Sequence, residues 1–349
     1  MNRRDFLHNA PTPFEPEPSR LFDSSLTLLR VTRRLMATQF EIAIPYGTPQ
    51  ALPAAQAALD RIADIESWMT VYDESSEVSR VNRDAARAPV SLSESLFNLL
   101  SQSSALSRET NGAFDPAVGA MIKAWGFYCR EGRLPTARER ARAMACSGMK
   151  HVALSEANRT VKFLRPGLEL NFGGIGKGFA LDRAAELLIN DWGITSALLH
   201  GGGSSVRAIG APPNDPRGWR IALNHPYDPN QSLGEIRLKN RGLGTSAATF
   251  QFFVYKGRKY GHVLDPRSGH PAEGTASASI LALTSSEADA LSTAAFVMGA
   301  TAFDAFRKPR PDIDAVILPE DGDRSPDDAT NNDASNRSAN DSAVLPTIP

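Results

Sequence analysis

The chain has 349 residues, which is enough for one large domain or for two closely packed ones. Its 38 lysines and arginines against 39 aspartates and glutamates give a formal net charge of −1, so it lacks the basic footprint of a nucleic-acid-binding protein. Two cysteines, Cys129 and Cys146, are too few for a disulfide framework or a zinc site, and no apolar run reaches the length of a membrane span.

The two ends of the chain differ in composition from the middle. Residues 1–25 are polar and rich in proline, which predicts a disordered or loosely packed arm. Residues 2–7 resemble the opening of a twin-arginine export signal, but the hydrophobic segment that should follow is absent. We therefore expect a cytoplasmic protein, with a periplasmic or membrane-associated location as the alternative. The acidic segment 320–349 predicts a disordered tail, which leaves 26–319 as the folded domain.

The first half of this domain predicts a strand followed by two helices. Residues 40–44 alternate in polarity like a half-buried strand, and Met36 before them suits a strand-edge core position. Apolar residues recur at helical spacing over 53–69. A capping box at 91–94 predicts the start of a second helix, and Asn-Gly at 111–112 predicts its left-handed stop.

Two loops of this half are candidate ligand contacts. Asp115 directly follows the second helix, where its carboxylate would accept hydrogen bonds either from a ligand or from nearby turn N–H groups. Thr70, Val71 and Tyr72 end the first helix, so the tyrosine ring would cover the face of a flat ligand, or simply pack as a helix end. Residues 133–150 are basic and rich in alanine, which predicts a surface helix.

A glycine-rich turn at 173–178 lies between a predicted strand, 168–172, and a predicted helix that ends near Gly193. Missing Cβ atoms let a backbone approach phosphate, and the N–H groups of a helix start attract anions. The segment matches neither the P-loop nor the dinucleotide fingerprint, so tight strand-to-helix packing is the alternative. Lys177 would neutralise phosphate or lie in solvent.

The stretch 260–299 carries the most chemistry. His262 and Asp265 flank a short apolar step, and proline and glycine within 266–269 predict a turn. From the residues alone, His262 is either a hydrogen-bonded structural histidine or a proton acceptor with a suitable pKa.

A helix is predicted after Ser285 and Ser286. It places Asp289 and Thr293 four residues apart on one face, where a carboxylate and a hydroxyl offer two hard oxygens to Mg²⁺. The alternative is a capping-box-like start over 286–289, in which Asp289 is favourable near the positive end of its own helix.

The fold class follows from the mixture of elements. Four further segments are β-rich or alternate in polarity, namely 219–223, 234–239, 250–255 and 276–283. With the helices they predict an α+β architecture with mixed or antiparallel sheets.

Taken together, the chain resembles the ApbE family of FAD:protein FMN transferases. The resemblance covers about residues 36 to 299 and rests on motifs in family order at 36–38, 69–72, 79–82, 112–119, 125–127, 171–182, 201–203, 245–246 and 260–299. It implies an ApbE-like fold with a flavin nucleotide cleft between its halves. It also implies Mg²⁺-dependent transfer of FMN from FAD to a threonine or serine hydroxyl of an acceptor flavoprotein, expected to be an electron-transfer protein, with release of AMP.

The resemblance also assigns roles to residues. The implied FAD contacts are Met36, Thr70, Val71, Tyr72, Asp115, Gly173, Lys177, Phe179, Val263 and Leu264. The implied Mg²⁺ ligands are the Gly176 carbonyl, Asp289 and Thr293. His262 would be the base, and Asp265 would orient it or bind a second metal ion.

The sequence departs from the family pattern at three points. Gly176 replaces an alanine, Ser204 replaces an aspartate, and Ser246 is followed by Ala247-Ala248 instead of Gly-Asp. A glycine keeps the backbone carbonyl, but the other two changes remove acids near the expected site. Two rival functions therefore stand beside transfer: a FAD pyrophosphatase that yields FMN and AMP, and a non-catalytic FAD-binding assembly protein.

Overall fold

The computed structural model describes residues 26–228, 231–247, 249 and 251–320. The predictions for 1–25 and 321–349 therefore lie outside the described residues, as does Ala248. Glu320, the first residue of the predicted tail, is described. Its N–H donates to the Gly274 carbonyl at 3.1 Å, and its carboxylate accepts from the Gly274 N–H.

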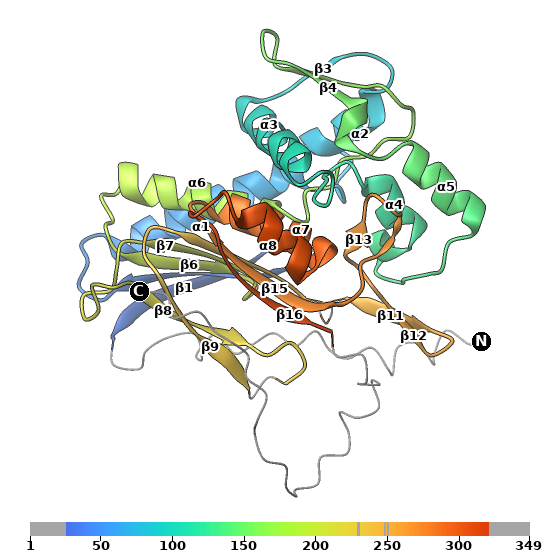
Figure 1. Cartoon of the computed structure of the whole chain (residues 1–349). Coiled ribbons are helices and arrows are strands. Elements are labelled where there is room, and N and C mark those ends of the chain that lie inside the picture. Colours follow the sequence, from blue (N-terminus) through green and yellow to red (C-terminus); the bar gives the residue numbers. More distant parts are fainter. Residues whose placement is uncertain (1–25, 229–230, 248, 250, 321–349) are drawn as a thin grey trace, which may run out of the picture.

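A seven-stranded sheet forms the centre of the molecule (Figure 1), and every pairing within it is antiparallel. In spatial order its strands are β1 Leu28–Leu35, β2 Thr38–Pro45, β6 Ala197–Gly201, β7 Ser205–Ile209, β10 Gly242–Ala247, β15 Thr275–Ala282 and β16 Asp314–Pro319. The predicted α+β class is confirmed, and so are the strands expected at 40–44 and 276–283.

Four helices cover one face of this sheet, namely α1 Ala51–Met69, α6 Gly176–Asn190, α7 Ser285–Met298 and α8 Ala300–Arg307. Apolar residues of this face and of the helices form the main core. Two glycines of β10 admit α7 at very short range: a Cβ on Gly242 or Gly244 would lie 2.4 Å from helix backbone atoms. The sheet therefore fixes where the first turns of α7 lie.

The opposite face of the sheet packs against a hairpin of β8 Trp219–Asn224 and β9 Ser232–Leu238. Trp219 and Ile221 of this hairpin join Leu198 and Val206 of the sheet in a second, smaller core. The strands predicted at 219–223 and 234–239 are confirmed.

Helices α2 Glu77–Asp84 and α3 Glu94–Glu109 accompany a small sheet of β3 Val90–Ser91, β5 Thr160–Phe163 and β4 Val152–Ser155. The predicted capping box at 91–94 is wrong in register. Ser93 is the N-cap, with its Oγ accepting from the Leu96 N–H, and Glu77 of α2 accepts from the Ser93 N–H and hydroxyl. The left-handed stop is confirmed, since Asn111 and Gly112 have φ of 49° and 75°.

A separate lobe lies at one end of the molecule (Figure 1). Its elements are α4 Gly119–Ala124, the 3-10 helix η2 Phe127–Cys129, α5 Ala137–Ala145, and the hairpins β11 Phe252–Tyr255 with β12 Arg258–Gly261 and β13 Leu264–Asp265 with β14 His270–Pro271. Buried Trp125 lies in its apolar core with Met121, Phe127 and Leu264. We call residues 118–150 and 251–273 the Trp125 lobe. The helix expected over 133–150 is confirmed only over α5, which begins at a Thr136 capping box.

The strand predicted at 168–172 is wrong. This segment joins no sheet, because its backbone groups bond to other parts of the chain instead. The Leu170 N–H donates to the Asn82 side chain at 2.7 Å, the Asn171 N–H donates to the Pro116 carbonyl, and the Glu169 carbonyl accepts from Gly119. A buried apolar run in the sequence does not show whether its backbone groups will bond to a neighbouring strand or to other parts of the chain.

Candidate active site

The glycine turn leads into α6 against the first turns of α7. The Gly178 N–H, in the first turn of α6, donates to Asp289 Oδ2 at 2.7 Å, and the Ser205 hydroxyl donates to the same oxygen at 2.9 Å. A Cβ on Gly178 would lie 2.1 Å from the Ser285 carbonyl oxygen. Glycine at this position is therefore what lets the two helices touch and brings Asp289 to the start of α6.

Asp289 does not cap its own helix, so the capping-box alternative is wrong. The N-cap of α7 is Thr284, whose hydroxyl accepts from the Glu287 N–H. The Asp289 carboxylate instead lies at the N-terminus of α6, where helix N–H groups favour negative charge. Burial nevertheless raises the pKa of Asp289 to about 6, against the opposing influence of Lys177 and its two hydrogen bonds.

Thr293 lies one turn further along α7, facing the glycine turn. A Cβ on Gly174 would be 3.1 Å from Thr293 Oγ1, which shows how closely this turn covers the hydroxyl. Thr293 Oγ1 is 3.3 Å from the Asp289 carbonyl oxygen and 3.5 Å from Ser246 Oγ, and Ser246 Oγ is 2.9 Å from Ser292 Oγ. The glycine turn, Asp289 and Thr293 are thus brought together as the sequence predicts.

These groups fit a magnesium ion. Among the described residues no hydrogen bond is made to Asp289 Oδ1, so this carboxylate oxygen has acceptor capacity left on a buried group. Carboxylate, hydroxyl and carbonyl oxygens are hard donors of the kind that Mg²⁺ takes. Within the described part of the chain no three His, Cys, Asp or Glu side chains gather as a metal site. The proposed ligands are one carboxylate, one hydroxyl and the Gly176 carbonyl, and such a set contains only one side chain of these four types.

His262 lies at the base of the β11–β12 hairpin. Its Nδ1 is 3.0 Å from the Gln251 carbonyl oxygen, and its backbone N–H donates to the same oxygen. Since a carbonyl only accepts, Nδ1 must carry the hydrogen, which leaves the lone pair of the neutral ring on Nε2. Burial lowers the pKa of His262, and the nearby Lys177 lowers it further. The imidazole is therefore neutral at neutral pH.

Asp265 does not bond to His262, although the resemblance implies that it orients this histidine. Its carboxylate accepts from the backbone N–H and from Nε of Arg267, both at 2.9 Å, and from Nη2 at 3.1 Å. The Gln251 carbonyl, not Asp265, holds the His262 ring in this structure. Gln251 has no sequence signal of its own, because only the pairing of β11 with β12 places it beside His262.

Two of the predicted FAD contacts have structural partners. Asp115 accepts from the N–H groups of Ala117 and Met149 and from the Ser107 hydroxyl, all at 3.0 Å or less, and burial raises its pKa. These bonds favour the alternative in which Asp115 holds a turn. Phe179 is buried, and its ring meets that of Trp68 edge-on with centroids 6.2 Å apart. Ligand roles for both remain predictions.

Other predicted contacts lie on turns. Met36 has φ of 50° in the tight β1–β2 turn, and its N–H donates to Glu66 at 2.7 Å. Thr70 is the C-cap of α1. The Tyr128 hydroxyl donates to the Val71 carbonyl. Tyr72 is 64% exposed, and its ring lies beside that of Tyr128, with centroids 4.9 Å apart.

The remaining predicted FAD contacts lie at the glycine turn or directly after His262 in the chain. Lys177, in the first turn of α6, lowers the pKa of both Asp289 and His262, so its positive charge lies near both groups. Gly173 is exposed at the glycine turn, with its N–H bonded to the Asn171 side chain. Val263 is half-buried and Leu264 belongs to the core of the Trp125 lobe.

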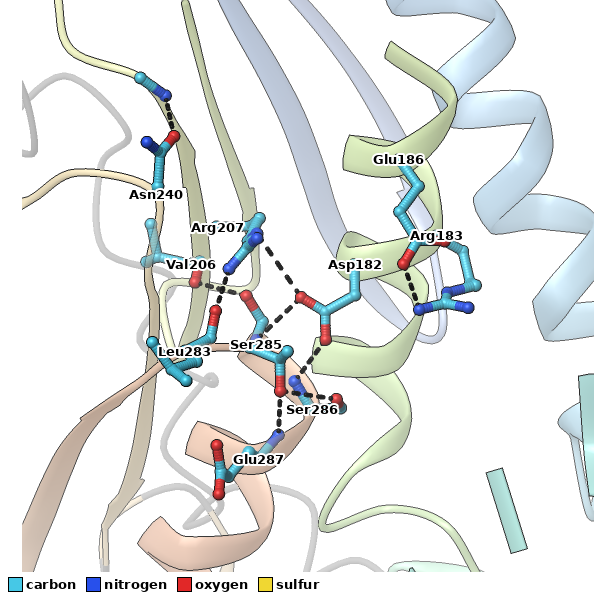
Figure 2. Close-up of polar contacts among 12 residues, drawn as sticks. Asp182, Arg183, Glu186, Val206, Arg207, Asn240, Leu283, Ser285, Ser286 and Glu287 are labelled. Atoms are coloured by element: carbon cyan, nitrogen blue, oxygen red, sulfur yellow. Dashed lines mark hydrogen bonds and ion pairs between the residues drawn. The ribbon is translucent and has the colours of Figure 1, made fainter. Parts of the chain in front are cut away.

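Asp182 holds the other end of the α6–α7 contact (Figure 2). Its two carboxylate oxygens accept from the N–H groups of Ser285 and Ser286 at 2.8 Å each, and Nε of Arg207 is 3.6 Å from Oδ1. Arg207 also donates to the Leu283 carbonyl at the end of β15. Sequence reasoning missed Asp182 and Ser205 as parts of the site, because their partners are distant in the chain.

Two hollows lie away from these residues. One borders Leu28 and Trp219, and the other borders Arg33 and Gln39. The flavin cleft expected between the halves of the fold therefore remains a prediction. No helix in the described residues is both long and apolar enough to cross a bilayer.

Comparison with known proteins gives one consistent result. The model of the ApbE family matches residues 36–317. FAD:protein FMN transferases from Klebsiella pneumoniae and Treponema pallidum are 29% and 30% identical, over 80% and 76% of this chain and 85% and 78% of theirs. The ApbE protein of Thermotoga maritima superimposes with a TM-score of 0.77 at 29% identity, covering 84% of this chain and 94% of that one. Flavin transferase ApbE from Vibrio cholerae superimposes at 0.74 and 25% identity, covering 85% and 95%. With its glycine turn, Asp289 and Thr293 assembled on that fold, the chain belongs to the ApbE family.

Proposed function

We propose that the protein is a Mg²⁺-dependent FAD:protein FMN transferase. The observation that carries the proposal is the meeting of the α6 N-terminus with Asp289 and Thr293, close to a neutral histidine. The names of the curated relatives and the family match support the same activity.

Asp289, Thr293 and the Gly176 carbonyl would hold Mg²⁺, which when bound neutralises phosphate charge as it develops. The N–H groups of Gly174 and Lys177, which make no hydrogen bond among the described residues, bind the FAD pyrophosphate, and the Lys177 side chain adds a positive charge there. These groups orient the FMN phosphorus for in-line displacement.

The reaction is written with His262 as the base. His262 Nε2 removes the proton from a threonine or serine hydroxyl of the acceptor. The hydroxyl oxygen then bonds to the FMN phosphorus as the bond from that phosphorus to the bridging oxygen breaks. AMP leaves with the bridging oxygen, and the acceptor keeps FMN as a phosphoester. Asp265 fixes the turn after His262 through Arg267, and a role in a second metal site is a further proposal for it.

The test incubates the protein with FAD, Mg²⁺ and a threonine-bearing acceptor domain and follows fluorescent acceptor, free FMN and AMP. Labelled acceptor with stoichiometric AMP supports transfer. Free FMN with AMP and no labelled acceptor would instead show a pyrophosphatase, and retained FAD without AMP would show a binding protein. Asp289→Ala and Thr293→Val are the matched variants, and both should lose the Mg²⁺-dependent product.

A further inference from the structure

The Trp125 lobe has a charge unlike the rest of the chain. Residues 118–150 and 251–273 contain eleven lysines and arginines against four aspartates and glutamates, although the whole chain has a net charge of −1. Several of these cations are already paired, for example Arg133 with Glu139, Arg258 with Glu273 and Arg267 with Asp265. The excess positive charge therefore comes from other residues.

Helix α5 carries part of that excess. Arg138 and Arg142 are exposed and lie four residues apart, on one face of the helix. In the described part of the chain, neither they nor Arg140 forms an ion pair or a side-chain hydrogen bond. A solvent-facing row of unpaired arginines has no role in holding this fold together, because surface charges without partners contribute little to stability.

The same lobe holds the proposed base. Ala143 of α5 packs in one core with Phe127 and Leu264, and the Phe127 ring lies 6.5 Å from that of His262. A Cβ on Gly269, in the turn after His262, would lie 2.5 Å from Met144 Sδ and 3.4 Å from Arg140 Cγ. Helix α5 therefore packs through Met144 and Arg140 against the turn that follows His262, while Arg138 and Arg142 lie on its exposed side.

We propose that the arginine face of α5 is a docking surface for the acceptor protein, which carries acidic side chains beside its modified hydroxyl. This inference rests on the proposed function, since it concerns the partner of the same site. An acceptor that presents a hydroxyl to His262 must lie against the Trp125 lobe. Complementary charge there would speed encounter and favour acidic partners, with a strong dependence on salt.

The experiment measures binding without turnover. Three fluorescent twenty-residue peptides each contain one threonine, flanked by aspartates, asparagines or lysines. Their affinities are measured by anisotropy with FAD present and Mg²⁺ omitted, at low and high salt. The variant is Arg138→Glu with Arg142→Glu, and the matched control is Arg61→Glu, an exposed arginine in the middle of α1, outside the lobe.

The aspartate peptide should bind at least tenfold more tightly than the asparagine peptide at low salt, and this preference should shrink at high salt. The double variant should lose about tenfold in affinity for the aspartate peptide, since it removes two attractions and adds two repulsions. Arg61→Glu should change it less than twofold. Unchanged melting temperatures would show that all variants are folded.

Equal binding of the three peptides, or equal loss in the control, would overturn the docking surface. A double variant that loses FAD affinity but keeps peptide affinity would also overturn it, and would assign the arginines to the nucleotide. Failure of the proposed function can be told apart from failure of the docking surface. In the first case no acceptor is labelled, while binding of the peptides can still be measured.

Discussion

Asp182 and Asp289 each place a carboxylate at the N-terminus of the other's helix. Asp182 of α6 accepts from the N–H groups of Ser285 and Ser286 that begin α7 (Figure 2), and Asp289 of α7 accepts from the Gly178 N–H in the first turn of α6. Both carboxylates are buried. The exchange fixes the two helix starts against each other, and the proposed nucleotide and metal groups lie at that contact.

The first prediction concerns Asp182 as a structural group. Asp182→Asn should lower the free energy of unfolding by about 1–3 kcal/mol, because an amide has one acceptor oxygen for two buried N–H donors. Chemical denaturation measures the change. Glu186→Gln is the control, since Glu186 lies on the exposed side of the same helix and should change stability by less than about 0.5 kcal/mol. Equal effects of the two variants would contradict this role.

The second prediction links Asp289, protons and Mg²⁺. Its pKa in the folded protein is about 6, above the usual carboxyl value, so without metal its contribution is fully favourable only below pH 4 and is lost as the pH rises through 6. At pH 7.5 the buried charge should cost about 3 kcal/mol, and a bound cation would offset it. Mg²⁺ should therefore raise the melting temperature more at pH 7.5 than at pH 5.

The variant for this prediction is Asp289→Asn, which keeps an oxygen for Gly178 and Ser205 but carries no charge. Without metal at pH 7.5 it should melt above the wild type, and Mg²⁺ should not shift it. An equal Mg²⁺ shift at both pH values, or a shift retained by the variant, would show that the metal binds elsewhere.

The third prediction concerns the space at the glycine turn. Gly174→Val should weaken FAD binding at least tenfold, because its Cβ alone would be 3.1 Å from Thr293 Oγ1 and its two methyl groups would extend over the turn. Equilibrium titration of FAD fluorescence measures the affinity. Gly174→Val combined with Thr293→Ala separates the causes, since it relieves the contact with Thr293 but not the obstruction of the nucleotide. If the double variant regains wild-type affinity, the nucleotide does not lie on the turn.

The fourth prediction separates binding from chemistry at His262. His262→Ala should keep FAD affinity within about threefold and lower acceptor labelling by about 10²–10⁴-fold, the usual contribution of a positioned base. Burial lowers the pKa of His262, so wild-type labelling should stay level down to its ordinary value of 6.5 and fall only at lower pH. The variant should lack this acidic limb.

Asp265→Asn is the companion variant. Since Asp265 bonds Arg267 and Gln251 holds the histidine, this change should leave the midpoint of the acidic limb where it is. A shift of the midpoint in Asp265→Asn, or labelling by His262→Ala at the wild-type rate, would move the base to another group.

The sequence by itself determined the fold class and most of the helices, and it predicted that the glycine turn, Asp289 and Thr293 belong together. The spacing of Asp289 and Thr293 on one helix face, the glycine turn and the Asn111-Gly112 stop are local patterns, and local patterns follow from backbone geometry that the residues dictate. The strands expected at 40–44 and 276–283 were found for the same reason. Strands β1, β7, β10 and β16 were not predicted, since their register depends on neighbours distant in the chain.

Only the tertiary structure decided which partner each polar group takes. Asp289 also looked suited to cap its own helix, but Thr284 does so. The Gly178 N–H instead donates to the Asp289 carboxylate, because Gly178 has no Cβ where α6 meets α7. Asp265 looked placed to orient His262. In the structure a turn brings the Asp265 carboxylate to Arg267, and the pairing of β11 with β12 brings His262 to the Gln251 carbonyl. A hydrogen bond needs a donor and an acceptor at the right distance. The sequence identifies each polar group, but only the packing of distant segments decides which partner comes within reach.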